Sequence, residues 1–123
     1  QKFSDFNKIK SVGKSLKDKK GLLLLAKKLE DAGSKLIVLE CISADTSKLI
    51  TKELSIPTIG IGASNNCDGQ VLVIDDILNF NSKFKKPKFV KNYVNIEENI
   101  VKAVNKFIKD VKAKKFPLRK HSY

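Results

Sequence analysis

The fold is decided by the stretch Leu36-Ile37-Val38-Leu39-Glu40, in which four consecutive apolar residues end on a carboxylate. Apolar side chains at every position are typical of a strand buried on both faces, as in a parallel sheet covered by helices. Just before it, Leu22, Leu25, Ala26 and Leu29 share one helical face and predict a helix over roughly 18–32. Ser15 with Asp18 resembles a capping box at its start, and Gly33 is a natural stop.

A second helix is expected directly after this strand. Ser43 or Asp45 can cap it, and it should run to about Leu54 before Pro57 ends it. Its inner side is expected to present Leu49, Ile50 and Leu54.

The rest of the chain continues the alternation of strands and helices. Short strands are expected at 58–62 and 71–74, separated by a polar loop over 63–69. Residues 79–95 are typical of a long loop or a broken helix. A final helix over about 96–113 carries one apolar stripe, formed by Ile100, Val101, Val104, Phe107, Ile108 and Val111. This order predicts an α/β fold with about three parallel strands and flanking helices.

Composition favours one folded domain, with 41% hydrophobic and 31% charged residues among 123. The longest apolar runs, such as 22–26, fall short of the roughly 20 residues that a transmembrane helix needs. The chain opens at Gln1 without a signal peptide and contains no Met, so it was processed or is part of a longer protein. Cys41 and Cys67 form no CxxC pair, which argues against a zinc site or a disulfide scaffold and favours a reduced, cytoplasmic protein.

The formal net charge of +12 raises nucleic acid as a partner. Arg119 is the only arginine, however, and base and phosphate recognition favour arginine over lysine. The excess is concentrated in residues 82–123, where a solvated helix face and a lysine-rich loop account for it. Nucleic acid is therefore not an expected partner.

Glu40 is the sharpest candidate for chemistry. The loops at the carboxyl ends of parallel strands are where α/β enzymes place their active sites. A carboxylate there would be partly desolvated, which raises its pKa and suits it to proton abstraction. The alternative is a strand-end glutamate that faces water or caps the next helix.

Other candidate residues have weaker signals. The stretch Gly60-Ile61-Gly62-Ala63 lacks the third glycine of a dinucleotide-binding loop, so it is either a turn that cradles a ligand or a site of tight packing. Asp68-Gly69 is an ordinary turn signal. Asp75 and Asp76 either line a site or cap a helix. Cys41 is expected in the core or a loop, and His121 on the surface near the terminus.

Several segments taken together resemble the ketopantoate hydroxymethyltransferase family. They occur in the family's order and at its spacing, and together they cover essentially the whole chain. The segments are Leu36 to Cys41, Ile56-Pro57-Thr58-Ile59-Gly60-Ile61-Gly62-Ala63, Asp68-Gly69-Gln70-Val71-Leu72-Val73, Pro87-Lys88-Phe89-Val90-Lys91, Phe116-Pro117 and His121-Ser122-Tyr123.

The resemblance implies a (β/α)₈ TIM barrel, of which residues 1–123 would be the C-terminal half of a single domain. Such enzymes move a hydroxymethyl group from 5,10-methylenetetrahydrofolate to 2-oxoisovalerate, giving ketopantoate for pantothenate biosynthesis. They act as cytoplasmic homo-oligomers, with Mg²⁺ chelating the keto acid and stabilising its enolate. The family's catalytic base maps onto Glu40, and its magnesium ligands map to the N-terminal half.

The chain also departs from the family's pattern. Asn7-Lys8 replace a glycine pair, Ile9 replaces a tyrosine, and Arg119-Lys120 replace an acidic pair before the terminal His. These changes are expected to alter local loops and assembly contacts. Without an N-terminal half, the chain is expected to be inactive and to leave apolar faces open. The alternatives are a non-catalytic remnant and a basic binding module.

Overall fold

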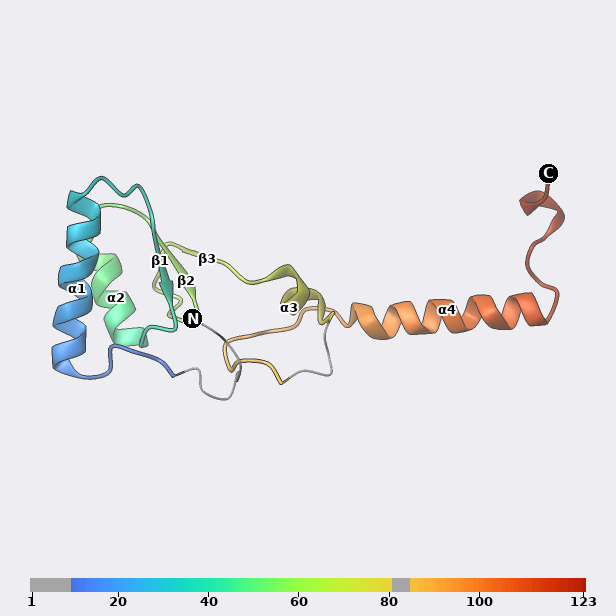
Figure 1. Ribbon diagram of the computed structural model, residues 1–123, viewed down its shortest axis with the longest axis horizontal. Coiled ribbons are helices and arrows are strands. Elements are labelled where there is room, and N and C mark those ends of the chain that lie inside the picture. The colour runs from blue at the N-terminus through green and yellow to red at the C-terminus, as the bar shows by residue number, and fades with distance from the viewer. Residues whose placement is uncertain (1–9, 81–84) are drawn as a thin grey trace. The chain divides into compact units, whose positions relative to one another are not determined.

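The computed structural model describes residues 10–80 and 85–123, which divide into two units. The first unit, residues 10–73 and 85–90, contains α1 (Leu16–Asp31), β1 (Ile37–Glu40), α2 (Ala44–Glu53), β2 (Thr58–Ile61) and β3 (Gly69–Gln70). The second unit, residues 74–80 and 91–123, contains α3 (Ile74–Leu78), α4 (Ile96–Lys112) and the 3₁₀ helix η2 (Arg119–His121). Figure 1 labels the helices and strands. Asn7, Lys8 and Ile9, which differ from the family's pattern, lie outside the described residues.

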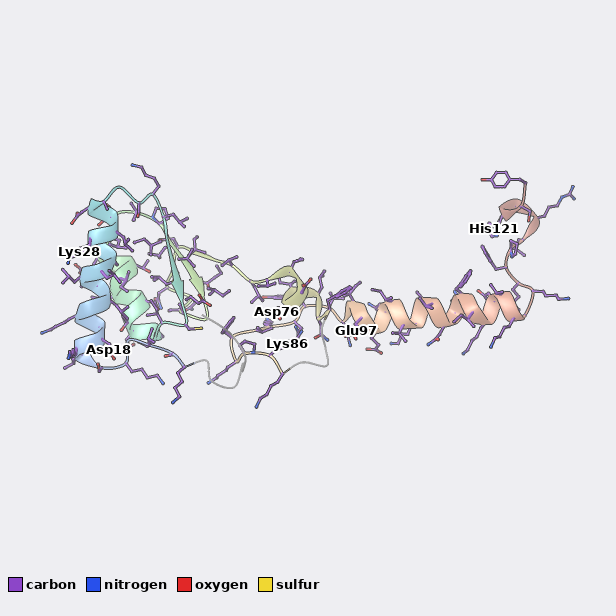
Figure 2. The ribbon with its side chains drawn as sticks, viewed as in Figure 1. Asp18, Lys28, Asp76, Lys86, Glu97 and His121 are labelled. Carbon is purple, nitrogen blue, oxygen red and sulfur yellow. The ribbon has the colours of Figure 1, made fainter. Side chains whose placement is uncertain are left out.

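Helix α1 begins and ends as its sequence signals predict, although it starts at Leu16 and not at 18. The Ser15 hydroxyl oxygen accepts a hydrogen bond from the Asp18 amide at 3.1 Å, which satisfies one of the free amides of the first turn. Asp18 lies in the first turn and Lys28 in the last turn (Figure 2), so both charges complement the helix dipole. Gly33 follows the helix with φ +95°, the left-handed conformation that favours glycine at a helix end.

The sheet of the first unit is parallel, with strand order β1-β2-β3 in the described residues. Strand β1 pairs with β2 from Ile37↔Thr58 to Glu40↔Ile61, and β2 pairs with β3 through Ile59↔Gly69 and Gly60↔Gln70. The predicted α/β fold with about three parallel strands and flanking helices is therefore confirmed.

The prediction of a third strand at 71–74 is wrong, because pairing occurs at Gly69–Gln70 and α3 already begins at Ile74. The ladder continues only through the Val71 amide, which donates to the Gly60 carbonyl oxygen at 3.0 Å. One register step further, Leu72 would face Gly62, which has left β2 with φ +63°. The apolar run thus loses its partner strand where that strand turns away.

The expectation that β1 is buried on both faces is also wrong. Leu39 is 3% exposed, whereas its neighbour Val38 is 54% exposed. Helices α1 and α2 contact each other and lie on one side of the sheet (Figure 1), and the core fills the space between. That core consists of Ala26, Ile37, Leu39, Ile42, Ile50, Leu54 and Cys67. Of the predicted α1 face, Leu22 and Ala26 pack inward, whereas Leu25 and Leu29 are exposed. Leu23, which was not predicted, also packs against the core.

Two carboxylates fix the backbone between these elements. Glu30 of α1 accepts from the Ser55 hydroxyl at 2.6 Å and from the Ser55 amide at 2.7 Å, and these bonds lower its pKa. Asp68 accepts from the Thr58 amide at 2.8 Å and the Thr58 hydroxyl at 3.0 Å, which lowers the pKa of Asp68. Asp68 is therefore more than a turn residue, because it anchors the first residue of β2.

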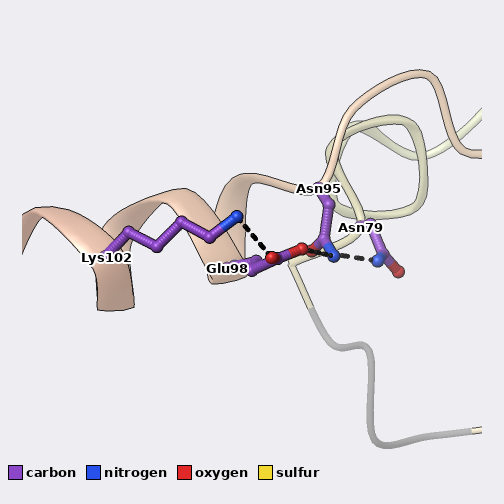
Figure 3. A network of polar contacts seen from close by, with 4 residues as sticks. All are labelled: Asn79, Asn95, Glu98 and Lys102. Atoms are coloured by element: carbon purple, nitrogen blue, oxygen red, sulfur yellow. Dashed lines mark hydrogen bonds and ion pairs between the residues drawn. The ribbon is translucent and has the colours of Figure 1, made fainter.

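In the second unit, α4 confirms the predicted last helix and ends close to its expected boundary. Its N-terminus is held by polar contacts that Figure 3 shows: Asn79 donates to Asn95 at 3.2 Å, and Asn95 donates to Glu98 at 3.0 Å. Glu98 in turn pairs with Lys102 at 2.5 Å. Every residue of the predicted apolar stripe is exposed among the described residues. No helix within residues 10–80 and 85–123 is long and apolar enough to cross a membrane.

Candidate active site

Glu40 is the last residue of β1, at the carboxyl edge of the parallel sheet. Side chains alternate along a strand, so Glu40 shares a face with exposed Val38, while Ile37 and Leu39 face the helices. The strand-end position is as predicted. The expected partial desolvation is not found, because Glu40 is exposed among the described residues. The reason is the one-sided cover of the sheet by α1 and α2.

The backbone after Glu40 is held in an unusual conformation. Cys41 has φ +51°, in the left-handed region that costs a non-glycine residue about 1 kcal/mol or more. Its amide donates to the Ile61 carbonyl oxygen at 2.9 Å, so the turn starts where Glu40 and Ile61 face each other. Such strain persists only where the surroundings determine it, and it often accompanies functional sites.

Hydrogen bonds to Val12 and Gly13 also hold the turn that follows Glu40. The Val12 amide donates to the Cys41 carbonyl oxygen at 2.9 Å, and the Ser43 amide donates to the Val12 carbonyl oxygen at 2.8 Å. The Gly13 carbonyl oxygen accepts from the hydroxyls of Ser43 and Thr46, both at 2.7 Å. The turn after Glu40 is therefore tied to the chain on both sides.

Thr46 and Ser47 of α2 are fully buried, and the apolar periodicity did not predict this. Ser43 precedes α2 as its cap residue, but its side chain bonds to Gly13 and makes no capping hydrogen bond. The small hydroxyl residues of the first turn let Gly13 approach the helix closely. The sequence signal that could have predicted this burial is the adjacent pair of small hydroxyl residues, Thr46 and Ser47, near the start of the helix.

The glycines of Gly60-Ile61-Gly62-Ala63 serve packing in the first unit. A Cβ on Gly60 would lie 2.8 Å from Gln70 Oε1 and 3.1 Å from Cys67 Sγ, and a Cβ on Gly62 would lie 2.7 Å from Phe89 Cδ1. Of the two interpretations left open by the sequence, the structure thus favours tight packing. Phe89 lies far along the chain from Gly62, and no periodicity or motif links the two.

The two cysteines are free, and their surroundings differ. Cys67 is buried in the core, and Cys41 is half-buried in the turn after β1, so both predictions for Cys41 hold in part. Burial raises the pKa of the Cys41 thiol, and the neighbouring Glu40 charge adds to this. Cys41 is therefore a poor nucleophile near neutral pH.

The remaining candidate residues belong to the second unit. Asp75 and Asp76 lie in the first turn of α3, where acidic side chains favour a helix, and not at a strand end. His121 lies in η2 (Figure 2) and is exposed, as predicted, with its ring 5.2 Å from that of Phe116. Among residues 10–80 and 85–123, no three His, Cys, Asp or Glu side chains are grouped as a metal site requires.

The parallel sheet with its helices places this chain among the α/β proteins, in which ligands typically bind at the carboxyl ends of the strands. Comparison with known proteins gives the family. The model of the ketopantoate hydroxymethyltransferase family matches residues 1–119, so the chain belongs to that family.

Individual relatives match this chain over 90% to 100% of its length. A Clostridium botulinum (strain 657 / Type Ba4) protein named 3-methyl-2-oxobutanoate hydroxymethyltransferase is 50% identical over 123 residues, covering 100% of this chain and 44% of the relative. Proteins of the same name from Pelagibacter ubique (strain HTCC1062) and Francisella tularensis subsp. tularensis (strain FSC 198) are 53% and 46% identical, and the matches cover 90% and 100% of this chain. The chain spans 42% and 46% of these two relatives, less than half their length.

Proposed function

We propose that this chain forms the C-terminal half of a (β/α)₈ barrel that transfers a hydroxymethyl group to 2-oxoisovalerate, the 3-methyl-2-oxobutanoate of the relatives' names. The one-carbon donor is 5,10-methylenetetrahydrofolate, and the product is ketopantoate. Glu40 is the catalytic base. The active assembly contains the region of the relatives that this chain does not span, and it is a homo-oligomer, as the resemblance implies.

The observation that supports this function best is the place of Glu40 on the sheet. Among the residues of β1 and β2, Glu40 has the only charged side chain. It shares the face away from α1 and α2 with Val38, Ile59 and Ile61, because register partners in a sheet point to the same side. A carboxylate at the carboxyl edge of an apolar sheet face is suited to a substrate that has both an apolar branch and an acidic C–H bond.

The chemistry proposed for Glu40 is proton transfer. Its carboxylate removes the proton from the carbon beside the keto group of 2-oxoisovalerate, and the electron pair of that C–H bond becomes the carbanion. The carbanion then forms the new carbon–carbon bond with the methylene carbon of the donor. The two bonds from that carbon to the nitrogens of the donor break, and water supplies the hydroxyl group. Tetrahydrofolate leaves with the substrate's proton and the second proton of the water on its nitrogens. Closure of the barrel over the open sheet face would desolvate Glu40 and make it a stronger base.

Magnesium is part of the proposed enzyme, but the described residues of this chain do not fit a site for it by themselves. Carboxylate oxygens are the ligands that Mg²⁺ prefers, and no three acidic, His or Cys side chains come together in residues 10–80 and 85–123. We therefore assign the magnesium ligands to the region of the relatives that this chain does not span.

The proposal is tested by the exchange of the substrate's acidic proton with deuterium. The chain is combined with the region of its relatives that it does not span, and exchange is followed by NMR with and without the Glu40→Gln substitution. We expect loss of exchange in Glu40→Gln and normal exchange in Glu53→Gln, which removes an exposed carboxylate of α2 that pairs with Lys27. Normal exchange in Glu40→Gln would exclude Glu40 as the base.

The same assay tests the first alternative, and a nucleic-acid binding assay tests the second. If the combined chains bind each other but never catalyse exchange, the chain is a non-catalytic remnant. A basic binding module would instead retain DNA or RNA with a steep dependence on salt concentration.

A further inference from the structure

The ring of Phe89 lies against the backbone of Gly62, the residue that follows β2. A Cβ on Gly62 would lie 2.7 Å from Phe89 Cδ1, 2.9 Å from Cγ and 3.2 Å from Cβ. The first two distances are shorter than real carbon–carbon contacts, so the ring fills the space where any other residue would place its side chain. Gly62 also has φ +63°, which favours glycine independently of the ring.

Gly62 is directly bonded to the residue that holds the end of β1. The Ile61 carbonyl oxygen, which belongs to the Ile61–Gly62 peptide, accepts the Cys41 amide at 2.9 Å. Cys41 follows Glu40, and Glu40 is the register partner of Ile61. A rotation of the Ile61–Gly62 peptide would therefore weaken this bond and release the strained turn at Cys41.

We propose that Phe89 is a positioning residue for Glu40. Its ring holds the Ile61–Gly62 peptide in one orientation, and the Ile61–Cys41 hydrogen bond passes this constraint to the end of β1. Phe89 acts through the backbone and is assigned no contact with substrate. The proposal rests on the base role proposed for Glu40, but the backbone coupling can be measured without any catalysis.

The coupling is tested by amide hydrogen exchange in the 123-residue chain. In Phe89→Ala we expect the Cys41 amide to exchange at least about ten-fold faster, because its acceptor is no longer held in place. The Leu54 amide, which donates to Ile50 at 3.1 Å in the same unit, serves as the internal reference and should keep its rate. The matched control is Phe80→Ala, which removes an exposed phenylalanine of the second unit.

The milder Phe89→Leu keeps an apolar side chain over Gly62 and should restore most of the Cys41 protection. Gly62→Ala approaches the contact from the other side and should release the Cys41 amide as Phe89→Ala does. If Cys41 and Leu54 accelerate by the same factor, Phe89 only stabilises the unit as a whole, and the proposal fails. An unchanged Cys41 rate in Phe89→Ala also overturns it.

The catalytic consequence is measured in the chain combined with the region of the relatives that it does not span. A misplaced base lowers kcat for proton exchange by roughly ten- to a hundred-fold. KM should stay nearly constant because Phe89 does not contact the substrate. A raised KM with unchanged kcat would make Phe89 a substrate contact and refute the positioning role. If Glu40→Gln retains exchange, the base role fails, whereas the amide-exchange result stands on its own.

Discussion

Glu40 and Ile61 face each other at the last paired position of β1 and β2, and the amide after Glu40 bonds to the Ile61 carbonyl oxygen at 2.9 Å. The backbone of Glu40 is thus held by the sheet, whereas its side chain is exposed. Because the core does not use this side chain, its chemistry and the stability of the fold should be separable.

The first prediction concerns that separation. Glu40→Gln should change the free energy of unfolding by no more than about 0.5 kcal/mol, as for most exposed positions. Ile50→Ala, at a residue 1% exposed in the core, should lower it by about 2–5 kcal/mol. Urea titrations followed by circular dichroism measure both. A large loss in Glu40→Gln would mean that Glu40 has a structural role.

The second prediction uses three glycines that differ in one property at a time. Gly13 has φ +81°, and a Cβ there would lie 3.0 Å from Leu22 Cδ1 and 3.2 Å from Thr46 Cβ. Gly33 has φ +95° with nothing within 4 Å, and Gly21 has open space and lies inside α1.

Alanine at Gly33 should therefore cost about 1 kcal/mol through its backbone conformation alone. Alanine at Gly13 should cost more, because its Cβ also displaces Leu22 or Thr46. Alanine at Gly21 should stabilise the chain by about 0.5–1 kcal/mol, since glycine is a poor helix former. The order of the three unfolding midpoints checks the prediction, and a Gly13→Ala protein as stable as Gly21→Ala would contradict it.

The third prediction is a dependence of stability on pH. Hydrogen bonds from the Thr58 amide and hydroxyl hold the pKa of Asp68 below its ordinary value. A carboxylate with a lowered pKa in the folded state stabilises the fold above its unfolded pKa of about 4. This stabilisation is lost as the pH falls through the lower, folded value.

Unfolding midpoints measured from neutral pH down to about pH 2 should show this loss in the parent chain. They should show a smaller loss in Asp68→Asn, which has no proton to gain. Thr58→Val removes the hydroxyl donor to Asp68, together with the hydrogen bonds of that hydroxyl to Thr51 and to the Asp68 amide, but it keeps the Thr58 amide donor. It should therefore reduce the pH dependence without abolishing it. If Asp68→Asn and the parent lose stability equally on acidification, Asp68 is not a source of the effect.

Periodicity predicted the elements that depend on local signals. The caps around α1 and the pairing of two apolar strands followed from Ser15, Gly33 and the run before Glu40, because these signals act within a few residues. The third strand was placed wrongly because Val71-Leu72-Val73-Ile74 has strand composition, but its partner turns away at Gly62. The contacts of Phe89 with Gly62 and of Thr46 with Gly13 were not predictable, since each joins residues far apart in the chain.

The last prediction compares the two faces of β1 at neighbouring residues. Leu39 faces the core and Val38 faces away from α1 and α2, so an aspartate has opposite consequences at the two positions. Leu39→Asp buries an unpaired charge and should unfold the chain, because the cost of several kcal/mol is comparable to the stability of a small domain. Val38→Asp should leave the isolated chain folded, with a loss in the free energy of unfolding below about 1 kcal/mol.

If the rest of the barrel closes over this face, however, Val38→Asp should prevent the chain from combining with the region of its relatives that it does not span. Urea unfolding and co-purification measure the two effects separately. Normal assembly of Val38→Asp would show that the exposed face of β1 is not where the rest of the enzyme packs.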